Sequence, residues 1–275
     1  MPELPETETI ARDLDREVSG RTIVTAKATK PDVLRGISAR ALASRLRDAA
    51  IEHVWRRAKL IVLDLSTSDR LVIQPRFTGA LLIDAGQLPP QERRYSTIQL
   101  SLDDGRTLHY RDIRRLGTVS LMPPDEFTQY TARLGVEPLD SAFTAEHLSA
   151  LVRRARRSIK SVLMDQRSLA GVGNIYANEA LWRAGIDPSR VATTLDRRES
   201  AQLRDALVGV LTESIAHRGT SFRDYRDARG ERGGFAEHLA VYGRAGEPCL
   251  RCGAALVGTH AIDGRMTVLC ARCQK

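Results

Sequence analysis

Four cysteines close to the end of the chain constrain its fold more than any other feature. They form two pairs, Cys249-x-x-Cys252 and Cys270-x-x-Cys273, with 17 residues between the pairs. This spacing is typical of a tetrahedral four-thiolate zinc site held on two knuckles of a β-hairpin. Four thiolates leave no open position for a water molecule, so the pattern favours one structural zinc ion over a catalytic one.

The residues between the cysteine pairs predict the hairpin itself. Two short strands are expected at 255–257 and 266–269, joined by a turn near Asp263-Gly264. Arg265 follows this turn, where its guanidinium group could bind a phosphate through two hydrogen bonds. The alternative is an arginine that is merely solvated.

The charge of the chain predicts a polyanionic partner. Its 275 residues include 42 Lys and Arg against 34 Asp and Glu, a formal net charge of +8. No stretch approaches the roughly 20 apolar residues of a membrane span, and charged side chains interrupt the first 20 residues, unlike a secretion signal. We therefore expect a soluble cytoplasmic protein with no membrane partner, in which cysteines bind metal rather than form disulfides.

The hydrophobic pattern changes near residue 135. Before it, short β-branched or alternating segments predict strands at 21–28, 51–55, 60–65, 71–73, 80–83, 97–102, 107–111 and 118–121, with helices at 6–18 and 39–49. After it, apolar spacings of three to four predict helices at 145–155, 159–164, 175–184 and 198–217. The expected order is a two-layer β-sandwich with flanking helices (1–134), a linker (135–142), a helical domain (143–235) and the zinc hairpin (236–275).

A glycine-bearing turn leads into one of the predicted helices. Gly171-Val172-Gly173 precedes Asn174, and backbone amides at the start of a helix can bind a phosphate. Lys160, on the preceding short helix, could join the same phosphate. The alternatives are glycines that serve only the geometry of the turn and a lysine that is simply exposed.

The first residues contain a candidate nucleophile. Removal of Met1 would leave the secondary amine of Pro2 as the first group of the chain. An α-amino group titrates near pH ~7.7–8.0, and a secondary amine that attacks an aldehyde carbon gives an iminium ion directly. Glu3 beside it suits proton transfer. The alternative is that Pro2 only permits removal of Met1, and that Glu3 and Glu6 form an acidic first helical turn.

In their order along the chain, these motifs resemble the formamidopyrimidine-DNA glycosylases, which form a helix-two-turn-helix superfamily with the endonuclease VIII type enzymes. The resemblance spans nearly the whole chain, and Leu4 favours the formamidopyrimidine branch because the other branch usually has glycine there. The matching segments are Pro2-Glu3-Leu4-Pro5-Glu6, Arg56-Arg57-Ala58-Lys59, Arg114-Arg115-Leu116-Gly117, Leu134-Gly135-Val136-Glu137-Pro138-Leu139, Ile159-Lys160, Leu163-Met164-Asp165, 171–177, Val241-Tyr242-Gly243-Arg244, Gly246-Glu247-Pro248-Cys249 and the cysteine pairs.

The resemblance implies a catalytic N-terminus. Pro2 would attack C1′ of a flipped damaged nucleotide, expel the base and form a Schiff base that decays by β- and δ-elimination. Glu3 would be the general acid and base, Glu6 would support it, and Lys59 would contact the lesion and its phosphate. Damaged double-stranded DNA is thus the implied partner, and nucleoid association the implied location.

The resemblance also implies how the DNA is held. Lys160 and Asn174 match phosphate-binding positions of the helix-two-turn-helix domain, and Tyr176, also expected to bind DNA, lies in the same motif. Arg265 matches the zinc-hairpin arginine that binds the phosphates near the lesion. A lesion-capping loop is expected within 219–235, where a flexible connector is the alternative. We expect a monomer, because both domains must contribute phosphate contacts to one duplex.

Two loops that would fill the gap left by the flipped nucleotide depart from the family pattern. Phe77 stands where the family usually has methionine, and Leu116 stands where it usually has phenylalanine, whereas Arg114 is kept. The expected function is a base-excision-repair glycosylase and abasic-site lyase acting on oxidised purines such as 8-oxoguanine and formamidopyrimidines. A glycosylase for oxidised pyrimidines and a non-catalytic damaged-DNA-binding protein are the alternatives.

Overall fold

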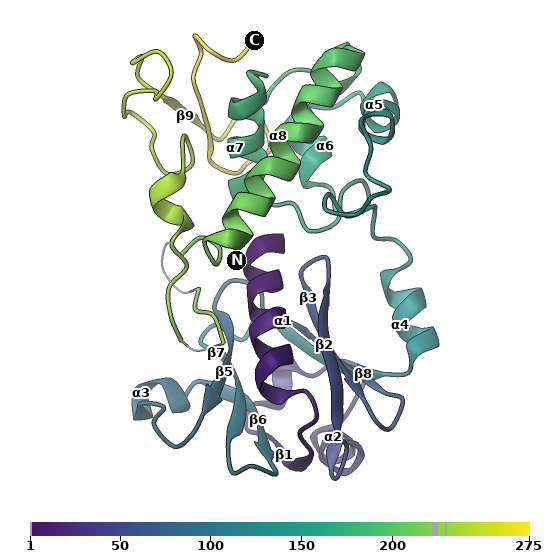
Figure 1. Ribbon diagram of the computed structural model, residues 1–275. Coiled ribbons are helices and arrows are strands. Elements are labelled where there is room, and N and C mark those ends of the chain that lie inside the picture. Colours follow the sequence, from purple (N-terminus) through teal and green to yellow (C-terminus); the bar gives the residue numbers. More distant parts are fainter. Residues whose placement is uncertain (1, 222–224, 229) are drawn as a thin grey trace. The chain divides into compact units, whose positions relative to one another are not determined.

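A computed structural model describes residues 2–221, 225–228 and 230–275 and divides the chain into two compact units (Figure 1). The first unit comprises Met1–Ala132 and His217–Gly234, and the second comprises Arg133–Ala216 and Phe235–Lys275. The contacts of 217–234 therefore group this segment with the β-rich unit, although the sequence suggested the helical domain. The two units are defined by contacts alone. The division into sandwich, linker, helical domain and zinc hairpin therefore stays a prediction. None of the described helices is long and apolar enough to span a membrane.

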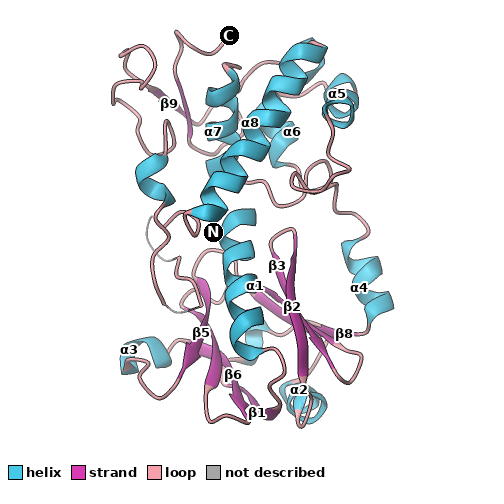
Figure 2. Cartoon of the chain, in the orientation of Figure 1, coloured by secondary structure: helices cyan, strands magenta, loops and turns pink. Residues whose placement is uncertain are grey.

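The first unit contains two antiparallel sheets, drawn in magenta in Figure 2. One has the strand order β1-β6-β7-β5 and the other β2-β3-β4-β8. Their bounds are β1 Ile23–Ala28, β2 Ile51–Arg57, β3 Leu60–Leu65, β4 Arg70–Gln74, β5 Gly79–Asp84, β6 Ser96–Leu102, β7 Thr107–Asp112 and β8 Thr118–Met122. Every strand expected from the sequence is present in this unit.

Both sheets contribute to one hydrophobic core. Leu100 and Leu108 from the first sheet belong to the same buried cluster as Leu63 and Leu71 from the second. Every second side chain of a strand points to the same face, so each sheet can bury one face in the core. Branched side chains pack well on such a surface. The predicted two-layer β-sandwich is confirmed.

Helix α1 (Leu4–Val18) packs its apolar face into this core. Ile10, Leu14 and Val18 recur every four residues and are completely buried. Fully burying each such side chain contributes about 1.5–3 kcal/mol. The start of α1, which carries the candidate catalytic residues, is therefore fixed to the sandwich.

The other helices of the first unit are short. α2 (Ala39–Leu46) was expected, whereas α3 (Pro90–Arg93), α4 (Pro124–Thr131) and the 3-10 turn Pro31–Val33 were not. α4 buries only Phe127 among its own residues, and α3 buries none, so neither has the apolar periodicity that identifies a helix in a sequence.

The second unit is mainly helical. Its elements are α5 Ala145–Arg153, α6 Ile159–Met164, α7 Asn174–Ala184, α8 Arg197–Ala216, the 3-10 turns Ala192–Thr194 and Phe235–His238, and the strands β9 Val257–Thr259 and β10 Thr267–Leu269. Thr144 and Ser158 cap α5 and α6 with their hydroxyl oxygens, and Gly185 ends α7 in the left-handed conformation. The helical character expected after residue 135 is confirmed.

The zinc hairpin is shifted from its expected register on one side. The first strand begins at Val257 rather than at residue 255. The two residues before it pair elsewhere: Ala255 bridges Pro248, and the Leu256 N–H donates to the carbonyl oxygen of Glu247. These two residues, which were expected in the first strand of the hairpin, thus form a second small pairing beside the first pair of cysteines.

A buried carboxylate on α7 holds the chain that enters the zinc hairpin. Glu179 is completely buried and accepts the backbone N–H groups of Ala240, Val241 and Tyr242 at 2.8–2.9 Å. Burial raises the pKa of Glu179, while these three hydrogen bonds act in the opposite direction. One side chain therefore fixes three consecutive residues.

Replacement of Glu179 by Gln is expected to destabilise the second unit. The amide nitrogen of Gln would face at least one backbone N–H, and a buried donor left without an acceptor costs about 1–3 kcal/mol. Chemical denaturation should show this loss, whereas Glu237→Gln, a change on the nearby 3-10 turn, should leave the unfolding free energy within roughly 0.5 kcal/mol. Equal stability of the two variants would contradict the assigned role.

Candidate functional site

The backbone at the start of α1 is held by the side-chain carboxylate of Glu6. Glu3 precedes the first residue of α1, and its N–H donates to Glu6 Oε2 at 2.8 Å. The other oxygen, Glu6 Oε1, accepts the N–H of Thr220 at 2.7 Å. Pro2, Glu3 and Glu6 are all buried. Glu6 thus connects the start of α1 to the segment 217–234.

That segment has a second attachment to α1. The guanidinium of Arg218 binds the carboxylates of Asp13 and Asp227, whose side chains are only 1% exposed, and this pairing raises the pKa of Arg218. Gly219 has a φ of +81°, and a Cβ there would lie 3.0 Å from the Glu6 side chain. The expected lesion-capping loop thus begins at a fixed point, whereas its residues 222–224 and 229 lie outside the described ones.

Lys59 lies in the tight turn between β2 and β3 and is 8% exposed. Arg56 supports this turn, because its Nε donates to Glu8 Oε2 at 2.7 Å and its Nη1 donates to the carbonyl oxygen of Ala58 at 3.1 Å. Burial raises the pKa of Glu8, but the hydrogen bonds and charges of Arg56 and Arg12 outweigh it and leave this pKa below its ordinary value. An ion pair from α1 therefore orients the turn that carries Lys59.

The two loops expected to fill the gap in the DNA stack present apolar side chains to solvent. Phe77 is 48% exposed and Leu116 is 40% exposed. The guanidinium carbon of Arg114 lies 5.4 Å from the centre of the Phe77 ring, within the range of a cation–π contact. The structure therefore brings Phe77 and Arg114 together, although they come from different loops.

A single buried carboxylate connects these loops. Asp112, at the end of β7, accepts the Thr78 hydroxyl at 2.5 Å and the Gly117 N–H at 2.8 Å, and the Thr78 hydroxyl oxygen accepts the Arg114 N–H at 3.0 Å. A Cβ at Gly117 would lie 1.8 Å from the Tyr110 hydroxyl oxygen, so only glycine fits there. Sequence reasoning missed Asp112, because an acidic residue at the end of a strand that also contains His109 and Arg111 gives no distinctive signal.

In the second unit, Lys160 is completely buried rather than exposed. Its ammonium group donates to Thr267 Oγ1 at 2.7 Å and to Asp263 Oδ1 at 3.2 Å. Both partners belong to the zinc hairpin, more than a hundred residues further along the chain. A buried ammonium requires such partners, because an isolated buried charge is strongly unfavourable.

Asn174 and Tyr176 on α7 have different surroundings. Asn174 is partly exposed, and its Nδ2 donates to the carbonyl oxygen of Met266 at 2.9 Å. Tyr176 is completely buried and shares a hydrogen bond of 2.6 Å with the Ser214 hydroxyl. Its side chain is therefore not displayed for a direct phosphate contact in this conformation, whereas that of Asn174 is.

The glycine-bearing turn before α7 is stabilised by a side chain. Gln166 accepts the N–H of Gly171 at 2.9 Å, and its amide donates to the carbonyl oxygens of Met164 and Val172. Gly171 has a φ of +93°, which favours glycine. The Gly171 amide therefore serves the geometry of the turn.

Arg265 is exposed, and no described residue forms an ion pair with it. It lines an open recess of about 360 Å³ together with Arg157, Arg167 and two carboxylates, Asp165 and Asp263. Arg157 is paired with Asp165 at 2.5 Å, so the recess is lined by both basic and acidic side chains. The structure thus connects Lys160, Asn174 and Arg265 through the turn between β9 and β10.

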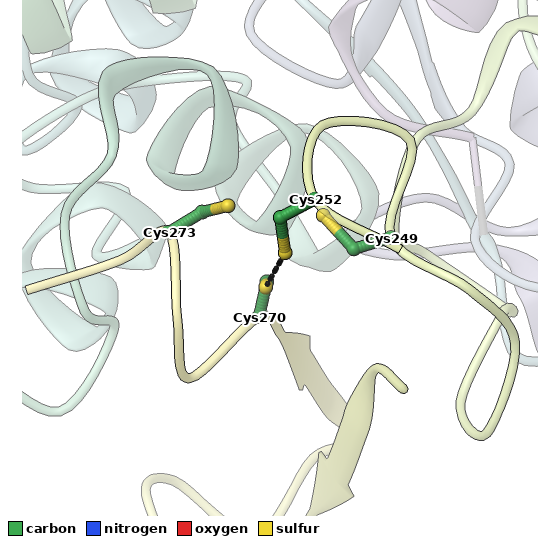
Figure 3. A group of neighbouring side chains, drawn as sticks. All are labelled: Cys249, Cys252, Cys270 and Cys273. Atoms are coloured by element: carbon green, nitrogen blue, oxygen red, sulfur yellow. Dashed lines mark hydrogen bonds between the residues drawn. The ribbon is translucent and has the colours of Figure 1, made fainter. Parts of the chain in front are cut away.

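The four cysteines lie together as predicted (Figure 3). Their sulfur atoms are all within 4.8 Å of one another, and Cys252 Sγ lies 3.5 Å from Cys270 Sγ. Sulfurs around a tetrahedral zinc ion with bonds of ~2.3 Å are about 3.8 Å apart, so the donor set fits. Burial raises the pKa of Cys249, but a hydrogen bond from the Arg251 N–H and other donors more than offset it and lower this pKa to about 6. The site holds one structural zinc ion.

Three family models match the chain. They are the formamidopyrimidine-DNA glycosylase N-terminal domain over residues 1–119, the H2TH domain of the same glycosylase over 134–226, and the zinc finger found in FPG and IleRS over 246–275. The three matches follow the order of the sandwich, the helical region and the cysteine hairpin.

Relatives match over the full length. The formamidopyrimidine-DNA glycosylase of Pelotomaculum thermopropionicum is 41% identical over 100% of this chain and 99% of its own, and that of Desulfitobacterium hafniense is 40% identical over 100% of both. A Lactococcus lactis Fpg in complex with abasic-site DNA has a TM-score of 0.92 at 30% identity, covering 99% of each chain. MutM (Fpg) of Thermus thermophilus has a TM-score of 0.88 at 35% identity, covering 99% of this chain and 98% of its own.

Domain order, cysteine site and full-length identity agree, and the chain therefore belongs to the formamidopyrimidine-DNA glycosylase family, a family of DNA-repair glycosylases with a zinc finger.

Proposed function

We propose that this protein is a bifunctional DNA glycosylase and abasic-site lyase of base excision repair that removes oxidised purines. The observation that carries the proposal is the buried arrangement of Pro2, Glu3 and Glu6 at the start of α1. Solved relatives support the substrate class, since there are complexes of Lactococcus lactis Fpg with abasic-site DNA and of a mutant of the same protein with Fapy-dG DNA. Its place of action is the chromosomal DNA of the nucleoid.

The chemistry begins once Met1 has been removed. The Pro2 nitrogen attacks C1′ of the damaged nucleotide, the glycosidic bond breaks, and the base leaves with the bonding electron pair and gains a proton. Glu3 supplies and removes protons as the sugar ring opens to the iminium ion. Loss of a C2′ proton then expels the 3′-phosphate, and a second elimination expels the 5′-phosphate. Glu6 keeps the Glu3 backbone in place through its hydrogen bond.

The exposed loops provide the means of extruding the nucleotide. A base inside a duplex is inaccessible, and flipping it costs a few kcal/mol. Phe77, Arg114 and Leu116 fill the vacated space, because apolar wedges replace part of the lost stacking. Their support by Asp112 keeps the wedge rigid before DNA arrives.

The second unit supplies phosphate contacts from Lys160, Asn174 and Arg265, whereas the buried Tyr176 supports α7 through its hydrogen bond with Ser214. Each phosphate that is neutralised releases counterions, so binding weakens as salt rises. The net charge of +8 agrees with this role.

A lesion range that includes oxidised pyrimidines is the second candidate. The observation that favours it is the altered wedge, in which Phe77 and Leu116 are both exposed but depart from the family pattern. A panel of duplexes that contain 8-oxoguanine, formamidopyrimidine or an oxidised pyrimidine separates the two ranges by their excision rates.

Borohydride trapping tests the nucleophile. Incubation of the protein with an 8-oxoguanine duplex and borohydride should give a covalent adduct, and mass spectrometry of peptides should locate it on Pro2. A version with extra residues before Pro2 is the control and should give no adduct. An adduct on a lysine, or full activity of the extended version, would overturn the mechanism.

A further inference from the structure

The ammonium group of Lys160 already has an anionic partner in the protein without DNA. Asp263 Oδ1 lies 3.2 Å from Lys160 Nζ, and the lysine side chain is 0% exposed. The same carboxylate oxygen accepts the N–H of Arg265 at 3.1 Å. Asp263 therefore contacts the ammonium group of Lys160 and the backbone of Arg265, two residues that are proposed to hold a DNA phosphate.

Asp263 also lines the open recess that contains Arg265. Its side chain is 14% exposed and lines the recess with Arg157, Arg167 and Arg265. A carboxylate and a phosphate are both oxygen anions that bind ammonium and guanidinium groups through charge-assisted hydrogen bonds. A phosphate at this position would therefore compete with Asp263 for the ammonium group of Lys160.

We propose that Asp263 occupies Lys160 in place of a DNA phosphate, and that a phosphate has to displace this carboxylate when the duplex binds. This inference rests on the proposed function, because it needs a DNA phosphate at Lys160. The ammonium also donates to Thr267 Oγ1 at 2.7 Å, and this hydrogen bond can keep Lys160 in position during the exchange. Asp263 thereby limits how tightly the zinc hairpin binds the phosphate backbone of DNA.

The substitution Asp263→Asn tests the exchange. Asn keeps an oxygen for the Arg265 N–H and for Lys160, so the turn should be retained, while the competing charge is removed. We expect the Kd for a duplex with a tetrahydrofuran abasic analogue to fall about three- to tenfold. The slope of a plot of log K against log salt should change little, because the same phosphate is neutralised in both proteins and the gain comes from the carboxylate that no longer has to be displaced.

Asp205→Asn is the matched control. Asp205 lies in the same unit, its side chain is 71% exposed, and it pairs only with the neighbouring Arg204 among the described residues. Asp205→Asn removes one negative charge, as Asp263→Asn does, but at a position far from Asp263 in the sequence. We expect its Kd and salt slope to stay close to those of the unmodified protein.

A double-mutant cycle shows whether Lys160 mediates the effect. In a Lys160→Met background, Asp263→Asn should no longer tighten binding. Because Lys160 is buried, zinc content and thermal unfolding are measured for each variant, and Lys160→Gln replaces Lys160→Met if the latter does not fold. An equal gain with and without Lys160, or no gain from Asp263→Asn, would overturn the proposal. Failure of the unmodified protein to bind the abasic duplex would instead contradict the proposed function.

Discussion

Replacement of Glu3 by Gln should abolish most base excision, lowering its rate by about 10²–10⁴-fold, which is the usual contribution of a general acid and base. The side chain is 4% exposed, so water does not readily take over its role. Gln keeps the size of the side chain and leaves the Glu3 N–H, which donates to Glu6, unchanged. The rate of 8-oxoguanine release under single-turnover conditions measures the effect.

The control for this prediction is a charge-matched change elsewhere in the same unit. Glu52 is exposed on β2 and forms no ion pair with any described residue, so Glu52→Gln should excise at the original rate. Binding of an abasic-analogue duplex should be nearly the same for both variants, because the effect lies in the chemical step. Excision by Glu3→Gln at the rate of Glu52→Gln would show that another group transfers the proton.

Loss of the zinc ion should weaken DNA binding and raise the Kd for an abasic-analogue duplex by at least about a hundredfold. Strands β9 and β10 are three residues each, and the associated core is small, with Val241, Leu256 and Val268 among its buried members. Such a hairpin is marginal without its metal, since structural zinc binding contributes about 10–16 kcal/mol in zinc-finger peptides. The turn that carries Arg265 would lose its fixed position.

Cys270→Ser is the direct test, and Leu250→Ser is its control. Leu250 lies between the first two cysteines and is 65% exposed, so its replacement should keep one zinc ion per chain and the original Kd. Cys270→Ser should lose both, as measured by elemental analysis and by fluorescence anisotropy with an abasic-analogue duplex. Unchanged affinity in a zinc-free Cys270→Ser protein would show that the hairpin does not hold the DNA.

The sequence predicted those parts of the fold that depend on local pattern. Strands such as 60–65 and the helix 159–164 match their observed bounds because apolar periodicity and turn residues determine them. The helix Pro124–Thr131 was missed because only Phe127 in it is buried. The four cysteines were recognised because their spacing alone specifies a ligand set.

Features that depend on contacts between distant residues were not predictable. The burial of Lys160 follows from Asp263 and Thr267, and nothing near residue 160 indicates these partners. The link between Glu6 and Thr220 spans 214 positions. Such pairs arise from packing, whereas sequence patterns report mainly on neighbours along the chain.

The shared support of the two wedge loops has a consequence for evolution and for protein engineering. Thr78 and Gly117 bind the same Asp112 carboxylate, so a shift of one loop changes the hydrogen bonding of the other. Residues that share a partner show non-additive effects. Phe77 and Leu116 are the neighbours of Thr78 and Gly117 along the chain, so we expect substitutions at these two positions to be epistatic, and directed evolution of lesion choice to require both positions in the same library.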